Sequence, residues 1–213
     1  MTRALRAVLG AVAGSALLLP GSLTAQGPSA PAAEMDEIAL ARSAAPAAIS
    51  DSADVLVLRD SGYARVRTGT TGAACLVSRP RAGSVVPVCY DPRAARSVLP
   101  AELMAHRLRA GGAAPEAADA AVERALQSGA LPRPAPGALA WMMSPRQRFI
   151  TPSGAAIGAW RPHVMVYLPS ARPGTVGFAS VGRGDMFLDK AGEGLAHVVV
   201  ATAGWSDESP GPQ

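Results

Sequence analysis

The three histidines, His106, His163 and His197, are the first side chains in this sequence that could do chemistry. An imidazole can bind a metal ion or transfer a proton near neutral pH. His163 and His197 each lie in an apolar stretch, and they would meet if the two stretches formed neighbouring strands. Together with Asp185 or Glu193 they could hold a metal ion, although their spacing matches no known ligand pattern such as HExxH. A metal-binding protein that uses His163 and His197 is therefore one alternative function.

Ser144 is the candidate nucleophile, because it directly follows an apolar stretch and the end of a strand can present a side chain to a cleft. A triad of Ser144, His163 and Asp185 can be written, which would make the protein a hydrolase with its site around Ser144 and His163. No serine lies in the G-x-S-x-G sequence of a nucleophile elbow. We therefore assign no catalytic residue and expect no cofactor, and the hydrolase is the second alternative.

The apolar stretches ALAWMM, residues 138–143, and HVMVYL, residues 163–168, favour binding over catalysis. Methionine side chains either fill irregular cores or line apolar pockets that accept varied ligands. If the two stretches come together, they form a pocket from Trp141, Met142, Met143, His163, Met165 and Tyr167. The function that the sequence favours is a non-enzymatic domain that binds a small apolar ligand or a partner protein of the cell envelope.

A predicted β-hairpin around the only two cysteines, Cys75 and Cys89, is the first element that must position these side chains. The cysteines lie symmetrically about the turn-rich segment RPRAG, so the hairpin pairs them and allows a disulfide. Closing a loop of about 15 residues stabilises a fold by roughly 3 kcal/mol. Leu76 and Val88 would then project from the opposite face and pack on helices. Pro87 has no N–H, which predicts an edge strand or a bulge.

The first 25 residues are predicted to be a signal peptide. Arg3 and Arg6 precede an apolar run over residues 7–19, and residues 23–25, LTA, end in a small side chain, so we expect cleavage before Gln26. The protein would then be exported to the periplasm or the extracellular space, without a transmembrane anchor after cleavage. Such compartments are oxidising, which agrees with the predicted disulfide.

Charge argues against a nucleic-acid partner. Removing Arg3 and Arg6 from the 20 basic residues leaves 18, against 16 acidic residues. The two signs are interspersed along the chain, without the run of basic residues that nucleic-acid binding favours.

Helix and strand patterns predict an α+β protein with a mainly antiparallel sheet and one domain over residues 34–204. Residues 26–33 are expected to form a disordered linker, and residues 205–213 a disordered tail. The predicted strands cover residues 54–59, 63–67, 138–143, 163–168, 175–180 and 195–202 besides the cysteine hairpin, whose strands complete an N-terminal four-strand meander. The predicted helices cover residues 34–44, 92–109 and 115–128, the last two as a helical pair packed on the sheet.

Five short motifs resemble a group of uncharacterised exported bacterial proteins. They are SAAP at residues 43–46, GTTGAACLV at 69–77, VPVCYDP at 86–92, AWMMS at 140–144 and PHVMVYLP at 162–169. The resemblance implies a shared envelope-protein fold, and it supplies no catalytic residue. It also implies that the methionine-rich strand and the PHVM strand act together.

Overall fold

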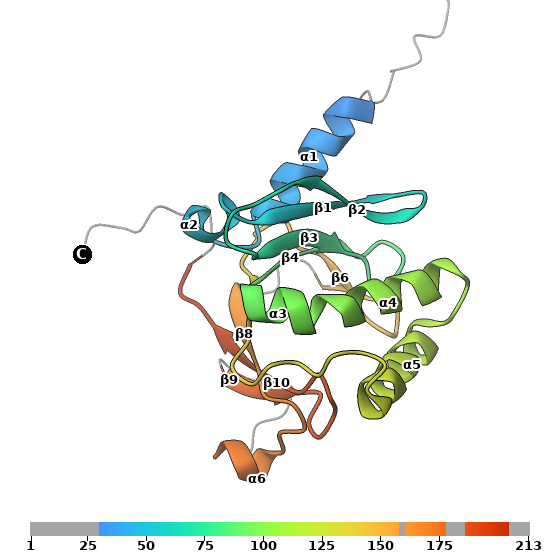
Figure 1. The fold of residues 1–213 in the computed structure, drawn as a ribbon, viewed down its shortest axis with the longest axis vertical. Helices are drawn as coiled ribbons and strands as arrows, with labels where there is room; N and C mark the ends of the chain where they lie inside the picture. The colour runs from blue at the N-terminus through green and yellow to red at the C-terminus, as the bar shows by residue number, and fades with distance from the viewer. Residues whose placement is uncertain (1–29, 158–160, 178–185, 205–213) are drawn as a thin grey trace, which may run out of the picture.

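The computed structural model describes residues 30–157, 161–177 and 186–204, and it has the predicted α+β architecture (Figure 1). Its main element is an eight-stranded sheet with the strand order β2-β1-β3-β4-β5-β8-β10-β9. These strands are β1 (Asp54–Arg59), β2 (Gly62–Arg67), β3 (Ala74–Ser78), β4 (Val86–Tyr90), β5 (Leu139–Met142), β8 (His163–Tyr167), β9 (Met186–Asp189) and β10 (His197–Ala201). A separate short pair is formed by β6 (Phe149–Ile150) and β7 (Ala156–Ile157).

Helices cover both faces of the sheet (Figure 1). On one face lies α1 (Ala30–Arg42), which begins four residues before the predicted start, inside the segment predicted to be a linker. The other face is covered by α3 (Pro92–Ser97) and α4 (Leu99–Ala110). The last helix of this group, α5 (Pro115–Ser128), packs on α4, so only part of the predicted helical pair touches the sheet directly. Two short helices complete the fold, α2 (Ala47–Ser50) and α6 (Pro173–Val176).

The helix ends follow their local sequence signals. The Asp91 carboxylate accepts a hydrogen bond from the Ala94 N–H at 2.6 Å, and Pro92 occupies the first turn of α3. At the other end of the helical segment, Gly129 closes α5 with a φ of 78°, a left-handed conformation that suits glycine. Both ends agree with the predicted boundaries.

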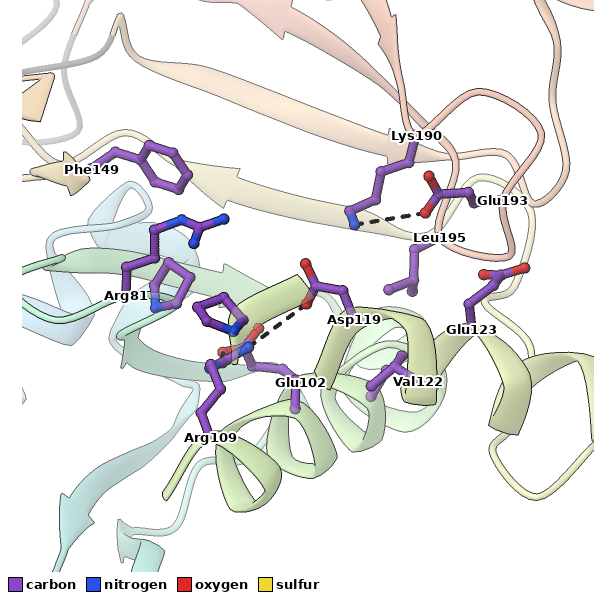
Figure 2. A pocket seen from close by; sticks show the side chains of 14 residues that line it. Arg81, Glu102, Arg109, Asp119, Val122, Glu123, Phe149, Lys190, Glu193 and Leu195 are labelled. Carbon is purple, nitrogen blue, oxygen red and sulfur yellow. Dashed lines mark ion pairs between the residues drawn. The ribbon is translucent and has the colours of Figure 1, made fainter. Parts of the chain in front are cut away.

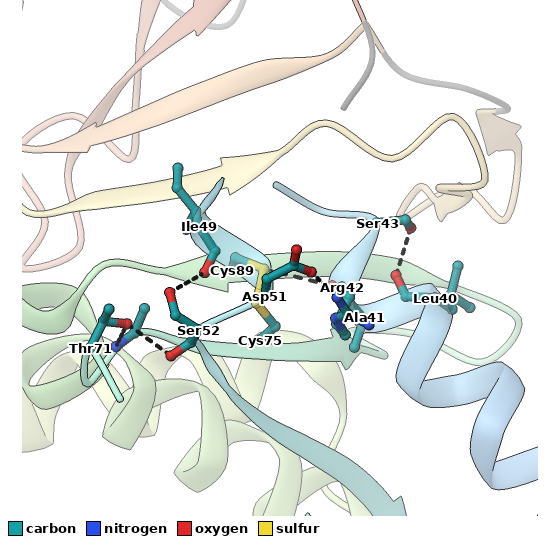
Figure 3. The surroundings of a disulfide bond; sticks show 11 residues. Leu40, Ala41, Arg42, Ser43, Ile49, Asp51, Ser52, Thr71, Cys75 and Cys89 are labelled. Atoms are coloured by element: carbon teal, nitrogen blue, oxygen red, sulfur yellow. Dashed lines mark hydrogen bonds and ion pairs between the residues drawn. A yellow bond between two sulfur atoms is a disulfide. The ribbon is translucent and has the colours of Figure 1, made fainter. Parts of the chain in front are cut away.

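The cysteine hairpin has the predicted register. In the β3–β4 ladder Cys75 lies opposite Cys89, and the two form a disulfide. The disulfide lies beside the end of α1, where the Cys89 Sγ is 3.7 Å from the Ala41 carbonyl oxygen (Figure 3). Leu76 and Val88 point to the other face and join the core against α3 and α4, as predicted.

The predicted four-strand meander is wrong. The β1 strand pairs with β2 in an antiparallel hairpin, but its other neighbour is β3, which runs parallel to it. Val55, Leu56 and Val57 of β1 are buried, whereas β2 carries Arg65 and Arg67 and lies at the edge. An edge strand with charged side chains resists pairing with other chains. Because β1 must bury its apolar side chains, it lies between β2 and β3 in the sheet, and β2 lies at the edge.

The return from β2 to β3 depends on a close backbone approach. The Gly69 N–H donates to the Asp54 carboxylate at 2.7 Å, and the Thr70 N–H donates to the Ser52 carbonyl oxygen at 2.9 Å. These bonds hold residues 68–71 against the start of β1, and they direct the chain into the parallel position.

Pro87 lies in an interior strand and not at an edge, because β4 pairs with both β3 and β5. The pairing with β5 covers only Cys89 and Tyr90. The chain leaves the sheet after β5 and returns at Arg148, which exchanges two backbone hydrogen bonds with Val85. The gap between these contacts lies beside Pro87, which has no N–H to donate.

The C-terminal part departs from the prediction in three places. Residues 173–176 form α6, so the first two residues of the strand predicted at 175–180 are helical, and residues 178–180 lie outside the described ranges. Pro173 starts the helical turn, and Gly177 ends it with a φ of 75°. The sequence also gave no indication of β9, or of the β6–β7 pair inside the predicted loop at 144–160.

Several predictions lie outside the described residues. These are the signal peptide, residues 26–29 of the linker, the tail at 205–213 and Asp185. Within the described ranges, no helix combines the length and the apolar composition needed to cross a membrane.

Candidate functional site

The six predicted pocket residues divide between the two faces of the sheet. Met142, His163, Met165 and Tyr167 lie on the face covered by α3 and α4, where they border cavities. Trp141 packs on the other face, against the cluster around the disulfide. The Met143 N–H donates to the Ala44 carbonyl oxygen at 2.9 Å, which directs this residue to the α1 side.

Two adjoining cavities lie over the sheet on the α3–α4 face. The smaller has a volume of about 100 Å³, and its walls include Val86, Met142, Phe149, His163, Met165, His197 and Val199. The larger has a volume of about 230 Å³, with walls that include Val88, Tyr90, Val98, Met165, Tyr167 and Leu195. The two cavities have four wall residues in common, namely Val86, Met142, Phe149 and Met165. Together they form an apolar cleft, because most of these side chains are aliphatic or aromatic.

A third cavity, of about 310 Å³, opens between α4, α5, the β3–β4 loop and the β9–β10 loop (Figure 2). It shares five wall residues with the larger apolar cavity, namely Pro80, Glu102, Phe149, Lys190 and Leu195. Unlike the apolar cleft, it is lined by charged side chains from all four segments. We call it the charged mouth, because it adjoins the apolar cleft at one end.

Arg81 in the charged mouth makes a close ion pair with Glu116 at 2.7 Å, but the ion pairs of Arg109 and Lys190 are longer. Arg109 lies 3.6 Å from a Glu102 oxygen and 3.8 Å from an Asp119 oxygen, and Lys190 lies 3.7 Å from Glu193. These distances exceed those of a hydrogen bond. The Nε and Nη2 atoms of Arg109 are buried and find no hydrogen-bond acceptor among the described residues.

His163 and His197 come from the paired strands β8 and β10, and both border the smaller apolar cavity. The Nδ1–H of His163 donates to the Arg161 carbonyl oxygen at 2.8 Å, and that of His197 donates to the Leu195 carbonyl oxygen at 2.9 Å. Burial lowers the pKa of both imidazoles, so both are neutral at neutral pH.

The described residues contain no group of three histidine, cysteine or acidic side chains arranged to hold a metal ion. His197 lies 3.6 Å from Asp189, and Asp185 is outside the described ranges. The third histidine, His106, stacks edge-on against Tyr63, with 4.8 Å between the ring centroids.

Ser144 lies away from the cavities. Its fully buried hydroxyl is 2.7 Å from the Ser43 hydroxyl, in the connection between α1 and α2, and it accepts a hydrogen bond from the Arg146 N–H. His163 borders the cleft on the opposite face of the sheet. The structure therefore does not bring Ser144 and His163 into one site.

Arg109, Phe149 and Lys190 border the site but were not singled out from the sequence. Arg109 lies in the last turn of α4, where a cation is expected simply to oppose the helix dipole. Lys190 has a φ of 51°, which is unusual for a residue with a side chain, but a backbone conformation has no clear sequence signal.

Comparisons of this chain with known protein families, with curated proteins and with solved structures found no match. The function is therefore inferred from the cavities themselves.

Acidification should destabilise the fold through His163 and His197. The folded state lowers their pKa below the unfolded value, so the unfolded chain binds more protons. Their contribution is complete above the unfolded pKa of about 6.5 and is lost as the pH falls below it. Urea unfolding at about pH 7.5 and at about pH 5.5 should show a smaller pH dependence for the double variant His163→Gln, His197→Gln than for the wild type.

His106 serves as the internal control, because burial and the nearby Arg109 also lower its pKa and it is present in both proteins. An identical pH dependence in the wild type and the double variant would show that His163 and His197 are not the titrating groups.

Proposed function

We propose that this protein is an exported, non-enzymatic binding protein that holds a small, largely apolar ligand in the cleft over the α3–α4 face of its sheet. The observation that carries the proposal is the continuity of the cavities, since Phe149 borders all three of them and Met165 borders both apolar ones. Ligand sites are typically concave and mainly apolar, with a few polar groups that orient the ligand.

The chemistry of the cleft supports binding over catalysis. Its floor consists of side chains such as Val86, Met165 and Val199, which offer no proton and no nucleophile. The Nδ1–H of each histidine is already bonded to a backbone carbonyl oxygen. Methionines adapt to ligands of different shape, because the side chain is unbranched and flexible.

Export is supported by the disulfide between Cys75 and Cys89. Disulfides persist in the periplasm and outside the cell, whereas cytosolic thiols are kept reduced.

A cavity-filling substitution tests the proposed function. Val199 is buried on β10 and borders the smaller apolar cavity. The substitution Val199→Phe therefore places an aromatic ring inside the cavity proposed to hold the ligand. Titration with the apolar fluorescent dye N-phenyl-1-naphthylamine should show saturable binding to the wild type. We expect binding to weaken by about tenfold or more in Val199→Phe, because the dye loses most of its buried contact area.

The matched control is Val166→Phe, which makes the same change on the half-buried opposite face of the neighbouring strand β8. This variant should keep the affinity of the wild type. Absence of saturable dye binding to the wild type, or equal affinity in Val199→Phe, would refute the proposed function.

A further inference from the structure

The larger apolar cavity is bordered by two tyrosines whose hydroxyls have no hydrogen-bond partner in the described part of the chain. These are Tyr90 and Tyr167, which are only 4% and 5% exposed. The third tyrosine, Tyr63, is different, because its hydroxyl donates to the Val77 carbonyl oxygen at 2.6 Å. A buried donor without an acceptor costs free energy, so both hydroxyls favour any group in the cavity that supplies an acceptor.

Both hydroxyls can be reached from the cavity. The side-chain atoms of the described residues that are fully enclosed and lack a partner include two nitrogens of Arg109, but neither tyrosine oxygen. The two phenol oxygens therefore keep accessible surface, and the cavity is the space that their side chains border. The Tyr167 ring is also held in place, since it lies against the His197 ring with 5.3 Å between the centroids. A ligand in this cavity thus meets a positioned donor.

The sheet holds the two tyrosines on the same face, on either side of β5. Tyr90 of β4 lies opposite Ala140, and the Tyr167 N–H of β8 donates to the Ala138 carbonyl oxygen at 2.9 Å. The two alanines are two positions apart on β5, so they share a face, and they belong to the same core cluster as the tyrosines. Because alanine side chains are small, no large side chain of β5 separates the two phenols.

The charges around this cavity favour a neutral ligand. Among its wall residues only Glu102 and Lys190 are ionised, and their charges are opposite. Burial, followed by the negative charge of Glu102, raises the pKa of Tyr90 and of Tyr167 above the usual value. Both phenols therefore keep their protons near neutral pH, and each O–H can donate a hydrogen bond.

We propose that the ligand is a neutral molecule whose carbonyl oxygen accepts hydrogen bonds from the Tyr90 and Tyr167 hydroxyls, while its aliphatic part lies over Met165. This inference rests on the proposed binding function and specifies the class of ligand for the same site. A carbonyl oxygen has two lone pairs, so it can accept from two donors at once. A ligand that displaces solvent from the cavity must replace the hydrogen bonds that solvent makes to these hydroxyls, which a purely apolar ligand cannot do.

Two ligands of the same shape separate the carbonyl oxygen from the chain: nonan-2-one, and 2-methylnon-1-ene, which has a CH₂ group in place of the oxygen. Their affinities are measured by displacement of N-phenyl-1-naphthylamine from the wild type and from the double variant Tyr90→Phe, Tyr167→Phe. We expect the ketone to bind about tenfold more weakly to the double variant, because two hydrogen bonds are lost. The alkene should bind the double variant at least as tightly as the wild type, since phenylalanine keeps the ring.

The matched control is Tyr63→Phe, which makes the same change at a tyrosine that borders none of the three cavities. It should leave both affinities unchanged. Urea unfolding without ligand gives a second measurement. Tyr63→Phe should be less stable than the wild type, because it loses the bond to Val77, whereas the double variant should be as stable as the wild type.

The outcomes distinguish the two proposals. If the double variant binds the ketone and the alkene as the wild type does, the carbonyl inference is overturned and the apolar site stays intact. Destabilisation of the double variant by as much as Tyr63→Phe also overturns it, because the two hydroxyls would then already have partners within the protein. Failure of the dye and of both ligands to bind overturns the proposed function itself.

Discussion

Replacing both Cys75 and Cys89 with alanine should lower the free energy of unfolding by about 3 kcal/mol and leave the native fold in place. The disulfide joins residues 14 positions apart, and without it the unfolded chain regains the freedom of that loop. The fold persists because the β3–β4 ladder, the apolar core around Leu76 and the other strands do not depend on the cross-link. Urea unfolding of the wild type and the double variant measures the difference.

The reduced wild type is the control for this experiment. It retains both sulfur atoms, so it separates the loss of the cross-link from the cavity that alanine leaves in a fully buried site. If the unfolding midpoint of the wild type is the same with and without reductant after refolding, the cross-link does not contribute the expected stability.

Gly69→Ala should destabilise the protein by about 3 kcal/mol, which is a large effect for one methyl group. A Cβ atom on Gly69 would lie 2.3 Å from both Ala53 C and Ser52 O. These are backbone atoms, so no change of rotamer can relieve the overlap. The return from β2 must instead move away from β1, which breaks the bond from the Gly69 N–H to Asp54. Urea unfolding again measures the change.

Gly174→Ala is the matched control, because a Cβ atom at this position has nothing within 4 Å and its φ is not in the left-handed region. It should unfold like the wild type. A Gly69→Ala protein as stable as the Gly174→Ala protein would contradict the close approach of residues 68–71 to β1.

The parts of the fold that could be predicted from the sequence depend on neighbouring residues. The disulfide register follows from the symmetry of Cys75 and Cys89 about a turn, and alternation then assigns each side chain of the hairpin to a face. The start of α3 at Asp91 and the end of α5 at Gly129 are equally local.

The parts that could not be predicted depend on contacts between distant residues. The parallel pairing of β1 with β3 is decided by which strand buries its side chains, and periodicity says nothing about strand order. The four residues of β9 are stabilised by pairing with β10 and have little strand signal of their own. Short strands of this kind form only in a tertiary context.

The candidate site was partly accessible to sequence reasoning. Alternation along a strand separates Trp141 from Met142, so the two could not have faced one pocket within a regular strand. Strict alternation of side chains between the two faces of the sheet assigns Met142 on β5 to the same pocket as His163, Met165 and Tyr167 on β8. Arg109 and Phe149 come from segments with no pattern that links them, and only the folded chain brings them together at the charged mouth.

Few hydrogen bonds hold the sheet together across its middle. The β4–β5 ladder covers only Cys89 with Trp141 and Tyr90 with Ala140, extended by a bond from the Asp91 N–H to the Leu139 carbonyl oxygen at 2.9 Å. The gap beside Pro87 begins at the other end of this ladder. The apolar cleft lies across this junction, since Ser78 and Val88 come from β3 and β4, whereas Met165 comes from β8. Local opening of a short ladder requires much less free energy than global unfolding. A ligand bound in the cleft would contact strands on both sides of this short ladder, and it would therefore add contacts that hold the two parts of the sheet together.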